Sequence, residues 1–479
     1  MNLIEHIITL FKSKVLDAGG AEKSVYEYLQ EGKVLKAVSM MQDRDDEVDK
    51  ALREYNPELH EVMRRPNKFR KKMSPYISEK LPRNRQDYIN EVELFFLLGN
   101  PIIWKKISGD DEAYKLFTDF LEEQFYHDNL CQAKRLAGAE TESAKLYHIT
   151  RKNGKINVKT VILSRSNGYK LRHLIDQYGN MQAFAYGYVL KEGGRNVQHW
   201  DFETSDFLFF CKSGIGGWEV TTYPNPTGKI NVIYYQQRKA WHGAEQRLKR
   251  DEMLDSKTAD TNNYFADPLA KASVDVIQSM TSPETIGGLI QTTGQNSVFE
   301  YINPPQSSES RESEKRSLNT SILFDTYTPD LSYDNLKGMG SLSGVAIKNS
   351  MTIGYIKRNR NIGVYKQLVR RDLHLMLEIL VLLHPEKADD IRGLKIDFEF
   401  AEPFDSDNGE NQSRIAALYQ KGVLSLEEAV RQLAICDDVN SEIKRLKDAE
   451  KNNTEASKSE ETNNNNNTKP VETSIKEGN

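Results

Sequence analysis

The chain has 479 residues, a length that suggests roughly two to four domains. Its composition is polar, with 38% hydrophobic and 28% charged residues, yet an aromatic content of 9% excludes a generally disordered chain. The formal net charge of −5 excludes a globally basic nucleic-acid binder, so any contact with DNA must be local or weak.

The first part of the chain is predicted to be helical, and a basic stretch follows it. Residues 1–56 are expected to form a helical segment with glycine turns near positions 19–20 and 32. Residues 64–85 then carry nine basic side chains against one acid, Glu79. This stretch indicates either a surface for nucleic acid or a partner, or a solvated basic face that pairs with acids of a neighbouring subunit.

Helices and then strands are predicted for residues 88–240. An apolar helix from position 88 ends at Gly99, and an Asn-Pro turn leads into a strand. Residues 111–136 are predicted to form one amphipathic helix, with Phe117, Phe120, Leu121 and Phe125 in the core. Between 144 and 235 the hydrophobic period changes to two, which predicts antiparallel strands at AKLYHITRK, KTVILSR, AFAYGYVL, DFLFFCK, WEVTTYP and INVIYYQ. Trp200 and Trp218 are expected to pack within this β region.

Two polar helices are predicted to flank a region of short strands. The first is the charged segment 241–267, roughly 40 Å long at 1.5 Å per residue. Residues 268–306 have short apolar runs, a Ser-Pro turn at 282–283 and VFEYINPP, which indicate small strands. The second polar helix covers 307–328.

A glycine-containing loop and a long helix come next. Pro329 removes Thr328 from helical geometry, and Gly338, Gly340 and Gly344 allow unusual backbone angles within the loop at 329–344. The long helix is predicted at 345–384. Its apolar stripe has spacings of three and four and consists of Leu368, Val369, Leu373, Met376, Leu377 and Leu380.

The C-terminal part is predicted to contain one strand, two helices and a disordered tail. LKIDFEF alternates as a strand does, and Ser425 is a candidate N-cap for the second helix before position 450. Residues 451–479 contain no aromatic residue and a run of asparagines, a composition typical of disorder.

No motif in the sequence predicts catalysis, a cofactor or a metal. The chain lacks a G-x-x-x-x-G-K-[ST] loop, and HEVMR lacks the second histidine of a zinc protease. The three cysteines form no C-x-x-C pair, so a disulfide framework and a zinc spacing are both excluded. No run reaches the roughly 18 apolar residues of a membrane helix. We therefore expect a non-enzyme with no membrane association.

The order of these segments resembles the portal proteins of tailed bacteriophages and prophages. Within these portal proteins, which are also called head-to-tail connectors, the chain resembles the subfamily typical of long-tailed phages of Gram-positive hosts. The motifs that carry it span about 57–447 and are LLGNPI at 97–102, SKTADTNNYFAD at 256–267, TPDLS at 328–332 and LSGVAIK at 342–348. The resemblance implies an α+β portal fold. Its first parts would be an α/β wing at 57–240, a helical stem at 241–267 and 307–328, and between the two stem helices a small β-containing clip at 268–306. A tunnel loop at 329–344, a long kinked tunnel helix at 345–384 and a helical crown within 385–450 would follow.

The same resemblance implies a function and partners. Portal subunits form a ring, usually of twelve copies, at one capsid vertex. Double-stranded DNA passes through the ring during genome packaging and ejection. The expected partners are the large terminase subunit, a head-completion adaptor, and the major capsid and scaffolding proteins. The expected location is the virion, after assembly in the host cytoplasm.

The resemblance also assigns two groups of site residues. The tip of the tunnel loop, which would face DNA, corresponds to Leu336, Lys337, Gly338, Met339 and Gly340. The clip turn that would dock the terminase or adaptor corresponds to Pro283, Glu284 and Thr285. Lys337 would offer one flexible charge to a passing phosphate without a bidentate clamp. The alternative is an ordinary surface loop whose lysine is solvated.

One alternative function remains open from the sequence. The basic residues at 64–85 and the β region are also compatible with a nucleic-acid-binding or processing factor outside the portal family. Such a factor would be monomeric or dimeric and would bind DNA in a salt-dependent way.

Overall fold

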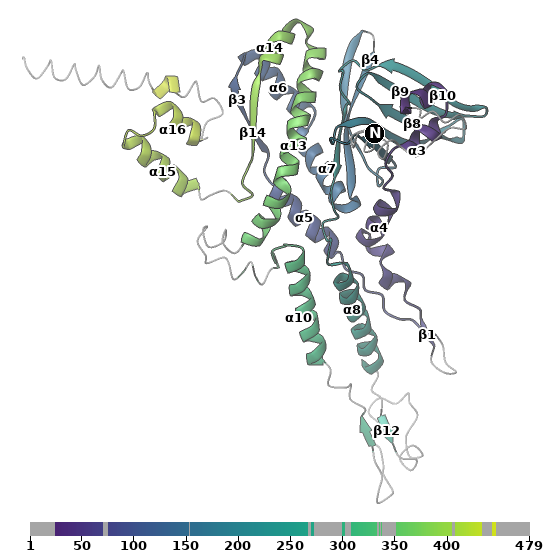
Figure 1. The fold of residues 1–479 in the computed structure, drawn as a ribbon. Coiled ribbons are helices and arrows are strands. Elements are labelled where there is room, and N and C mark those ends of the chain that lie inside the picture. The colour runs from purple at the N-terminus through teal and green to yellow at the C-terminus, as the bar shows by residue number, and fades with distance from the viewer. Residues whose placement is uncertain are drawn as a thin grey trace, which may run out of the picture. The chain divides into compact units, whose positions relative to one another are not determined.

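The computed structural model combines helices with antiparallel sheets, which is the α+β class predicted (Figure 1). It divides into two compact units, and the first contains nearly all of the elements. The residues that the structure describes are 24–69, 75–152, 154–266, 270–272, 299–301, 308–332, 335, 337, 351–404, 408–433 and 443–446.

Three short helices open the described chain. They are α2 (Val25–Gln30), α3 (Val34–Met40) and α4 (Asp45–Tyr55), followed by the 3-10 turns η1 (Pro57–Leu59) and η2 (Glu61–Arg64) and the strand pair β1 (Lys68–Phe69) and β2 (Pro75–Tyr76). A capping box begins α2, because the Ser24 side chain and the Glu27 carboxylate each bind the other's backbone N–H. The predicted turn at position 32 is present, and Gly32 has the positive φ of 70° that favours glycine.

The helix-to-strand junction predicted near Gly99 is confirmed, whereas the single helix predicted at 111–136 is wrong. Helix α5 (Arg85–Leu98) ends at Gly99 and leads into β3 (Ile102–Ser108). The 111–136 region instead forms α6 (Asp111–Glu123) and α7 (Tyr126–Glu140), separated at Phe125, whose φ is 48°. The Gln124 side chain bonds to Thr160 and to the Val158 carbonyl of the neighbouring strand, which holds the break in place. Phe125 was also predicted to be buried, but it is 68% exposed.

The β region consists of two antiparallel sheets. Its strands are β4 (Glu142–Lys152), β5 (Lys155–Leu163), β6 (Lys170–Ile175), β7 (Met181–Glu192), β8 (Arg195–Glu203), β9 (Phe207–Gly214), β10 (Gly217–Pro224) and β11 (Val232–Gln236). One sheet has the order β10-β9-β8-β7-β6 and the other β11-β4-β5. The antiparallel pairing predicted from the alternating pattern is therefore confirmed, although β6 and β8 were not among the predicted strands. Trp200 and Trp218 pack into the core beneath α2 and α3, as expected.

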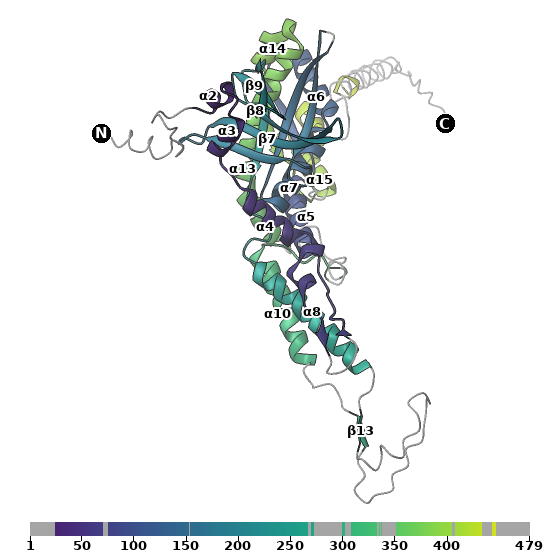
Figure 2. The same ribbon diagram turned by 90° about the vertical axis from the view of Figure 1, so that its right-hand side faces the viewer.

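Two polar helices lie side by side below the sheets, as Figures 1 and 2 both show. These are α8 (Glu245–Ala266) and α10 (Ser308–Asp325), close to their predicted bounds. Between them, β12 (Ala270–Ala272) pairs antiparallel with β13 (Phe299–Tyr301). The remaining predicted elements of 268–306 lie outside the described residues.

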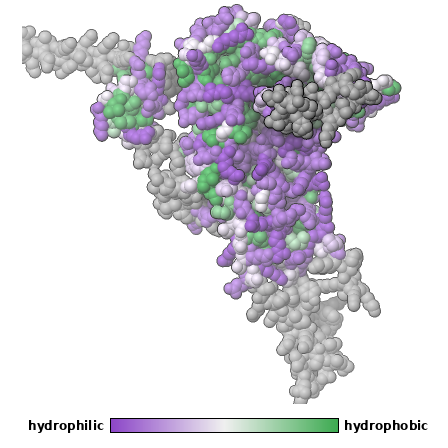
Figure 3. All heavy atoms as spheres, in the orientation of Figure 1, coloured by the Kyte–Doolittle hydropathy of each residue, from purple (hydrophilic) through white to green (hydrophobic). Residues whose placement is uncertain are grey.

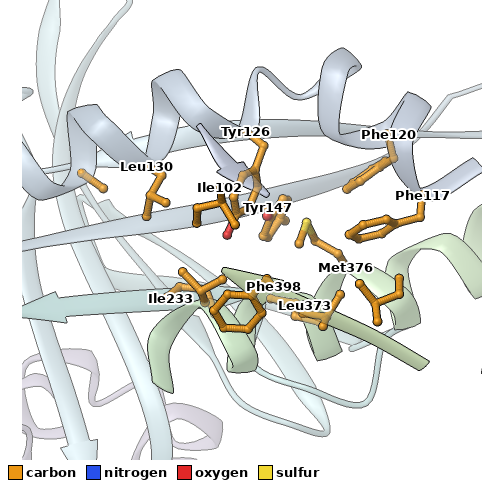
Figure 4. Close-up of a cluster of buried hydrophobic side chains, with 14 of the residues drawn as sticks. Ile102, Phe117, Phe120, Tyr126, Leu130, Tyr147, Ile233, Leu373, Met376 and Phe398 are labelled. Atoms are coloured by element: carbon orange, nitrogen blue, oxygen red, sulfur yellow. The ribbon is translucent and has the colours of Figure 1, made fainter. Parts of the chain in front are cut away.

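The long helix α13 (Thr352–Leu383) closes the main core. Of its predicted stripe, Val369, Leu373, Met376 and Leu380 are fully buried. The 3-10 turn η3 (Pro385–Lys387), helix α14 (Ala388–Gly393) and strand β14 (Lys395–Phe400) follow, and β14 pairs with β3. Figure 4 shows how Phe117 and Phe120 from α6 face Leu373 and Met376 from α13 across this core.

The described residues of the second unit include two helices joined by a turn. These are α15 (Asn408–Gln420) and α16 (Leu426–Leu433). The predicted N-cap is confirmed, since the Ser425 hydroxyl accepts a hydrogen bond from the Glu428 N–H at 3.2 Å. The predicted disordered tail at 451–479 lies outside the described residues.

Candidate functional site

Helix α8 holds an extended segment of the basic stretch along its length. Its side chains at 252, 256 and 260 accept hydrogen bonds from the backbone N–H groups of residues 83, 81 and 79, with distances of 3.0, 3.0 and 2.8 Å. Four helical residues rise about 6 Å and two extended residues span about 6.6 Å, so the two repeats run in register. The i, i+4, i+8 spacing of Glu252, Ser256 and Asp260 therefore matches an extended chain, and we call this pairing the stem clamp.

Ion pairs reinforce the stem clamp. Arg65 binds Asp260 at 2.7 Å, and both side chains are less than 10% exposed. Arg83 pairs with Asp255, and Arg85 lies 3.2 Å from Asp251. These arginines belong to the basic stretch at 64–85. One interpretation of that stretch was that it pairs with acids of a neighbouring subunit. For these three arginines the acids lie on α8 of the same chain, so that expectation is corrected. Arg70, Lys71 and Lys72 lie outside the described residues.

The end of α10 is tied to α5 just before the loop. The Tyr88 hydroxyl donates to the Pro329 carbonyl at 2.8 Å and accepts from the Leu331 N–H at 2.9 Å. Tyr327 has a φ of 51°, and the Arg360 guanidinium lies 4.8 Å from its ring centroid. These contacts fix the point at which the chain leaves α10 for residues 333–350.

A buried ion-pair cluster attaches α13 to α5 and α7. The Glu93 carboxylate lies 2.6 Å from Lys134 Nζ and 3.2 Å from Lys357 Nζ, and all three side chains are at most 7% exposed. Burial raises the pKa of Glu93, but the two lysines lower it by more, so its pKa lies below the usual range. Burial lowers the pKa of Lys357 and Glu93 opposes this change. We call Glu93, Lys134 and Lys357 the wing ion cluster.

Two further contacts hold α13 along its length. Arg358 donates to the carbonyls of Phe400 and Ala401, both at 2.9 Å, beside β14. About three turns before the other end of the helix, Asp372 pairs with the fully buried Lys145 and accepts a hydrogen bond from the Tyr147 hydroxyl at 2.8 Å. Helix α13 is thus bonded to the end of β14 near its start and to β4 beyond its middle.

The predicted loop tip is only partly within the described residues. Lys337 is helical and exposed, and its ammonium makes no ion pair with a described residue. Leu336, Gly338, Met339 and Gly340 lie outside the described residues, as do Pro283, Glu284 and Thr285 of the predicted clip turn. The structure therefore leaves both assignments as predictions.

Sequence reasoning did not find the wing ion cluster. Lys357 and Arg358 belong to a helix with several other basic residues, but both are buried in contacts within the chain. The available signal was Glu93, an acid inside the apolar run YINEVELFFLL, where burial demands a partner.

The face of the molecule that Figure 3 shows is mainly hydrophilic. In Figure 3 hydrophilic residues cover most of the face around α8 and α10, and hydrophobic residues form small separate patches. In the described ranges no helix is long and apolar enough to cross a membrane. Nor do His, Cys, Asp or Glu side chains gather into a metal-binding group among these residues.

Comparisons with known proteins identify the family. The chain is similar to solved structures of gene transfer agent (GTA) particles, all matched over 74% of this chain and 89% of the other. The virion of a native particle has 10% sequence identity to this chain and a TM-score of 0.37. The neck of a native particle, computed with C12 symmetry, has 10% identity and a TM-score of 0.41. The neck of an empty particle, computed with C6 symmetry, has 9% identity and a TM-score of 0.41. No curated protein matches the chain. The family model described as "Phage portal protein, SPP1 Gp6-like" matches residues 40–456, and the chain therefore belongs to this family of phage portal proteins.

Proposed function

We propose that this portal protein forms a ring at one capsid vertex, through which double-stranded DNA passes during genome packaging and ejection. The observation that carries the proposal is the family match over residues 40–456. The chemistry of the described residues supports it, because the basic side chains of the stem clamp and the wing ion cluster already have acidic partners within the chain. A channel that holds few free cations does not retard DNA by firm phosphate contacts.

The tunnel loop at 329–344 is proposed to face the DNA, with Leu336, Lys337, Gly338, Met339 and Gly340 at its tip. The tie between Tyr88 and the backbone at 329–331 supports this assignment, since it gives the loop a fixed base on α5. The exposed ammonium of Lys337 is available to a phosphate. An ordinary surface loop remains the alternative.

The clip at 268–306 is proposed to dock the large terminase subunit and later a head-completion adaptor, with Pro283, Glu284 and Thr285 in the docking turn. The pairing of β12 with β13 supports a small β element between the two stem helices. Capsid and scaffolding proteins would contact the same ring from outside. ATP hydrolysis would belong to the packaging motor, so the portal itself is proposed to be a non-enzyme. Its location would be the virion, after assembly in the host cytoplasm.

Electron microscopy of the purified full chain tests this function. We expect negatively stained rings with a central hole, with twelve copies as the expected number. A monomer or dimer that binds duplex DNA with a steep salt dependence would instead favour the nucleic-acid-processing alternative. The pairing of Arg65, Arg83 and Arg85 with α8 argues against that alternative, because these cations are already neutralised.

A further inference from the structure

An open groove of about 1070 Å³ lies between α13 and the turns at 179–181 and 228–230. Lys229, Lys366, Arg370 and Arg371 line it together with the apolar side chains Ile233, Leu375 and Phe398. We call this site the basic groove. It combines several cations with a partly apolar lining, so a complementary ligand must offer both carboxylates and an apolar group.

The cations of the basic groove are only partly neutralised. Asp397 is the one acid among the described residues that line it, and it pairs with Arg370 at 3.0 Å. Lys229 lies 3.5 Å from Glu378. Lys366 and Arg371 make no hydrogen bond or ion pair with any described residue. Burial lowers the pKa of His374 in the lining, and the neighbouring Lys229 and Arg370 lower it further, as expected from an excess of positive charge.

The corner between α6 and α7 has the opposite character. Phe125 is 68% exposed there, and four exposed carboxylates surround it in sequence: Asp119, Glu122, Glu123 and Asp128. Their side chains make no ion pair with the described part of the chain. We call this site the acidic corner. It presents an aromatic ring among uncompensated acids, which is the chemistry that the basic groove requires.

The two sites lie at opposite edges of one sheet. The acidic corner is bonded to β5 through Gln124, whereas the basic groove contains Ile233 of β11. Since the strand order is β11-β4-β5, these are the two outer strands. Two different patches at separate places on a subunit make a heterologous contact, and such contacts generate rings when the rotation closes.

We propose that the acidic corner of one copy docks into the basic groove of the next, with Phe125 on the apolar lining and the carboxylates beside Lys366 and Arg371. The inference rests on the proposed ring and names a contact that holds it together. Complementary charge would also set the direction in which subunits add, because corner against corner and groove against groove are repulsive.

Charge reversal on the full chain tests the contact. We expect E122K/E123K and K366E/R371E each to raise the protein concentration needed for rings by about tenfold or more, because like charges then face each other. Combining all four substitutions in one chain restores opposite charges at every contact, so rings should return. D206K/E219K reverses two exposed acids elsewhere in the β region and is the matched control, which should assemble as the unmodified chain does.

Mixing the two reversed proteins provides a test that misfolding cannot imitate. In each variant alone the substituted positions face side chains of like charge, whereas alternating copies bring oppositely charged positions together at each contact. Analytical ultracentrifugation should therefore show rings in the equimolar mixture and not in either variant alone. If the unmodified chain forms no rings, the proposed function fails. If it does and both variants still assemble alone, or the mixture and the quadruple variant stay monomeric, the docking proposal is overturned.

Phe125 offers an independent variant. Asparagine tolerates a φ of 48° better than phenylalanine, and the ring is largely exposed, so F125N should leave the monomer at least as stable. It should nevertheless weaken ring formation about tenfold, because the apolar part of the contact is lost. A thermal melt measures the stability of the monomer, and sedimentation measures ring formation. Ring formation unchanged in F125N would remove Phe125 from the contact.

Discussion

Glu93 lies between Lys134 and Lys357, and all three side chains are buried. We expect E93Q to lower the free energy of unfolding by about 3–5 kcal/mol, because it leaves two buried ammonium groups without a carboxylate. Urea unfolding measures the change. E91Q is the matched control on the same helix, since Glu91 pairs with Arg135 at the surface, where such pairs contribute about 0–1 kcal/mol. Equal effects of the two variants would contradict a structural role for the wing ion cluster.

The wing ion cluster also predicts a pH dependence. The pKa of Glu93 is lower in the folded than in the unfolded chain, so its contribution is present above about pH 4.3 and is lost as pH falls through the folded pKa. We expect the stability difference between the unmodified chain and E93Q to shrink in acid, in melts recorded from pH 7 downwards. A difference that stayed constant down to pH 2 would show that Glu93 is not held ionised by the two lysines.

Glu203 titrates in the opposite sense. It is fully buried at the end of β8, where its carboxyl accepts from Asn231 at 3.2 Å, and burial raises its pKa to about 7. The folded chain therefore keeps a proton that the unfolded chain releases near pH 4.3, so stability falls as pH rises from about 4 to 7. In E203Q the loss of melting temperature between pH 5 and pH 8 should be smaller than in the unmodified chain. If the melting temperatures of E203Q and the unmodified chain changed with pH in parallel, Glu203 would already be ionised in the folded chain. E219Q, which alters an exposed acid, is the control.

At the scale of elements, the stem clamp is the contact most open to a direct test. D260A removes the carboxylate that binds both Arg65 and the Glu79 N–H. We expect the free energy of unfolding to fall by about 3 kcal/mol, because the mostly buried guanidinium of Arg65 is left without its acidic partner. D260N retains an oxygen that can accept from the Glu79 N–H, so it should lower the free energy of unfolding by less. Hydrogen exchange at residues 79–83 should rise in D260A before it rises in the sheets. Unchanged exchange there would show that the extended segment does not depend on α8.

The sequence predicted elements where local chemistry decides them. Gly99 and the Asn-Pro turn define the junction of α5 and β3, and Ser425 caps α16. Residues 111–136 contain no proline or glycine, so nothing local marks the break at Phe125. The break depends on Gln124, which bonds to a strand more than 30 residues away. Strand β8 was missed because its exposed half is followed by a continuously buried half, so it lacks a regular alternation.

The candidate site was predictable only in part for the same reason. A glycine-containing loop between two helices is visible in sequence, whereas the partner of a buried charge is not. Lys357 and Arg358 look like the neighbouring surface cations of a basic helix, and only the packing of α13 against α5 and β14 distinguishes them. Buried pairs such as Lys145 with Asp372 join positions more than 200 residues apart, which no local pattern encodes.

At the scale of the molecule, α13 is bonded to α5 by Lys357, to the end of β14 by Arg358 and to β4 by Asp372. These ties leave residues 333–350 as the stretch between two fixed points, the Tyr88 contact and the start of α13. A side chain in this stretch is repeated once per subunit in the proposed ring, so a single substitution changes the charge of the whole channel wall. The proposed tunnel loop is therefore tested best by one residue altered in all copies.

K337E would replace a ring of positive charges by a ring of negative charges at the proposed constriction. Rings should still form, because Lys337 is exposed and makes no ion pair with a described residue. Packaging or retention of DNA should change, and the change should be larger at low salt, since the screening length falls from about 30 Å at 0.01 M to about 10 Å at 0.1 M. K337R should behave as the unmodified chain, because one flexible cation replaces another, and K50E controls for charge on an exposed helix. Packaging and retention measured across salt concentrations decide the matter: if K337E matches K50E at every concentration, Lys337 does not line the channel.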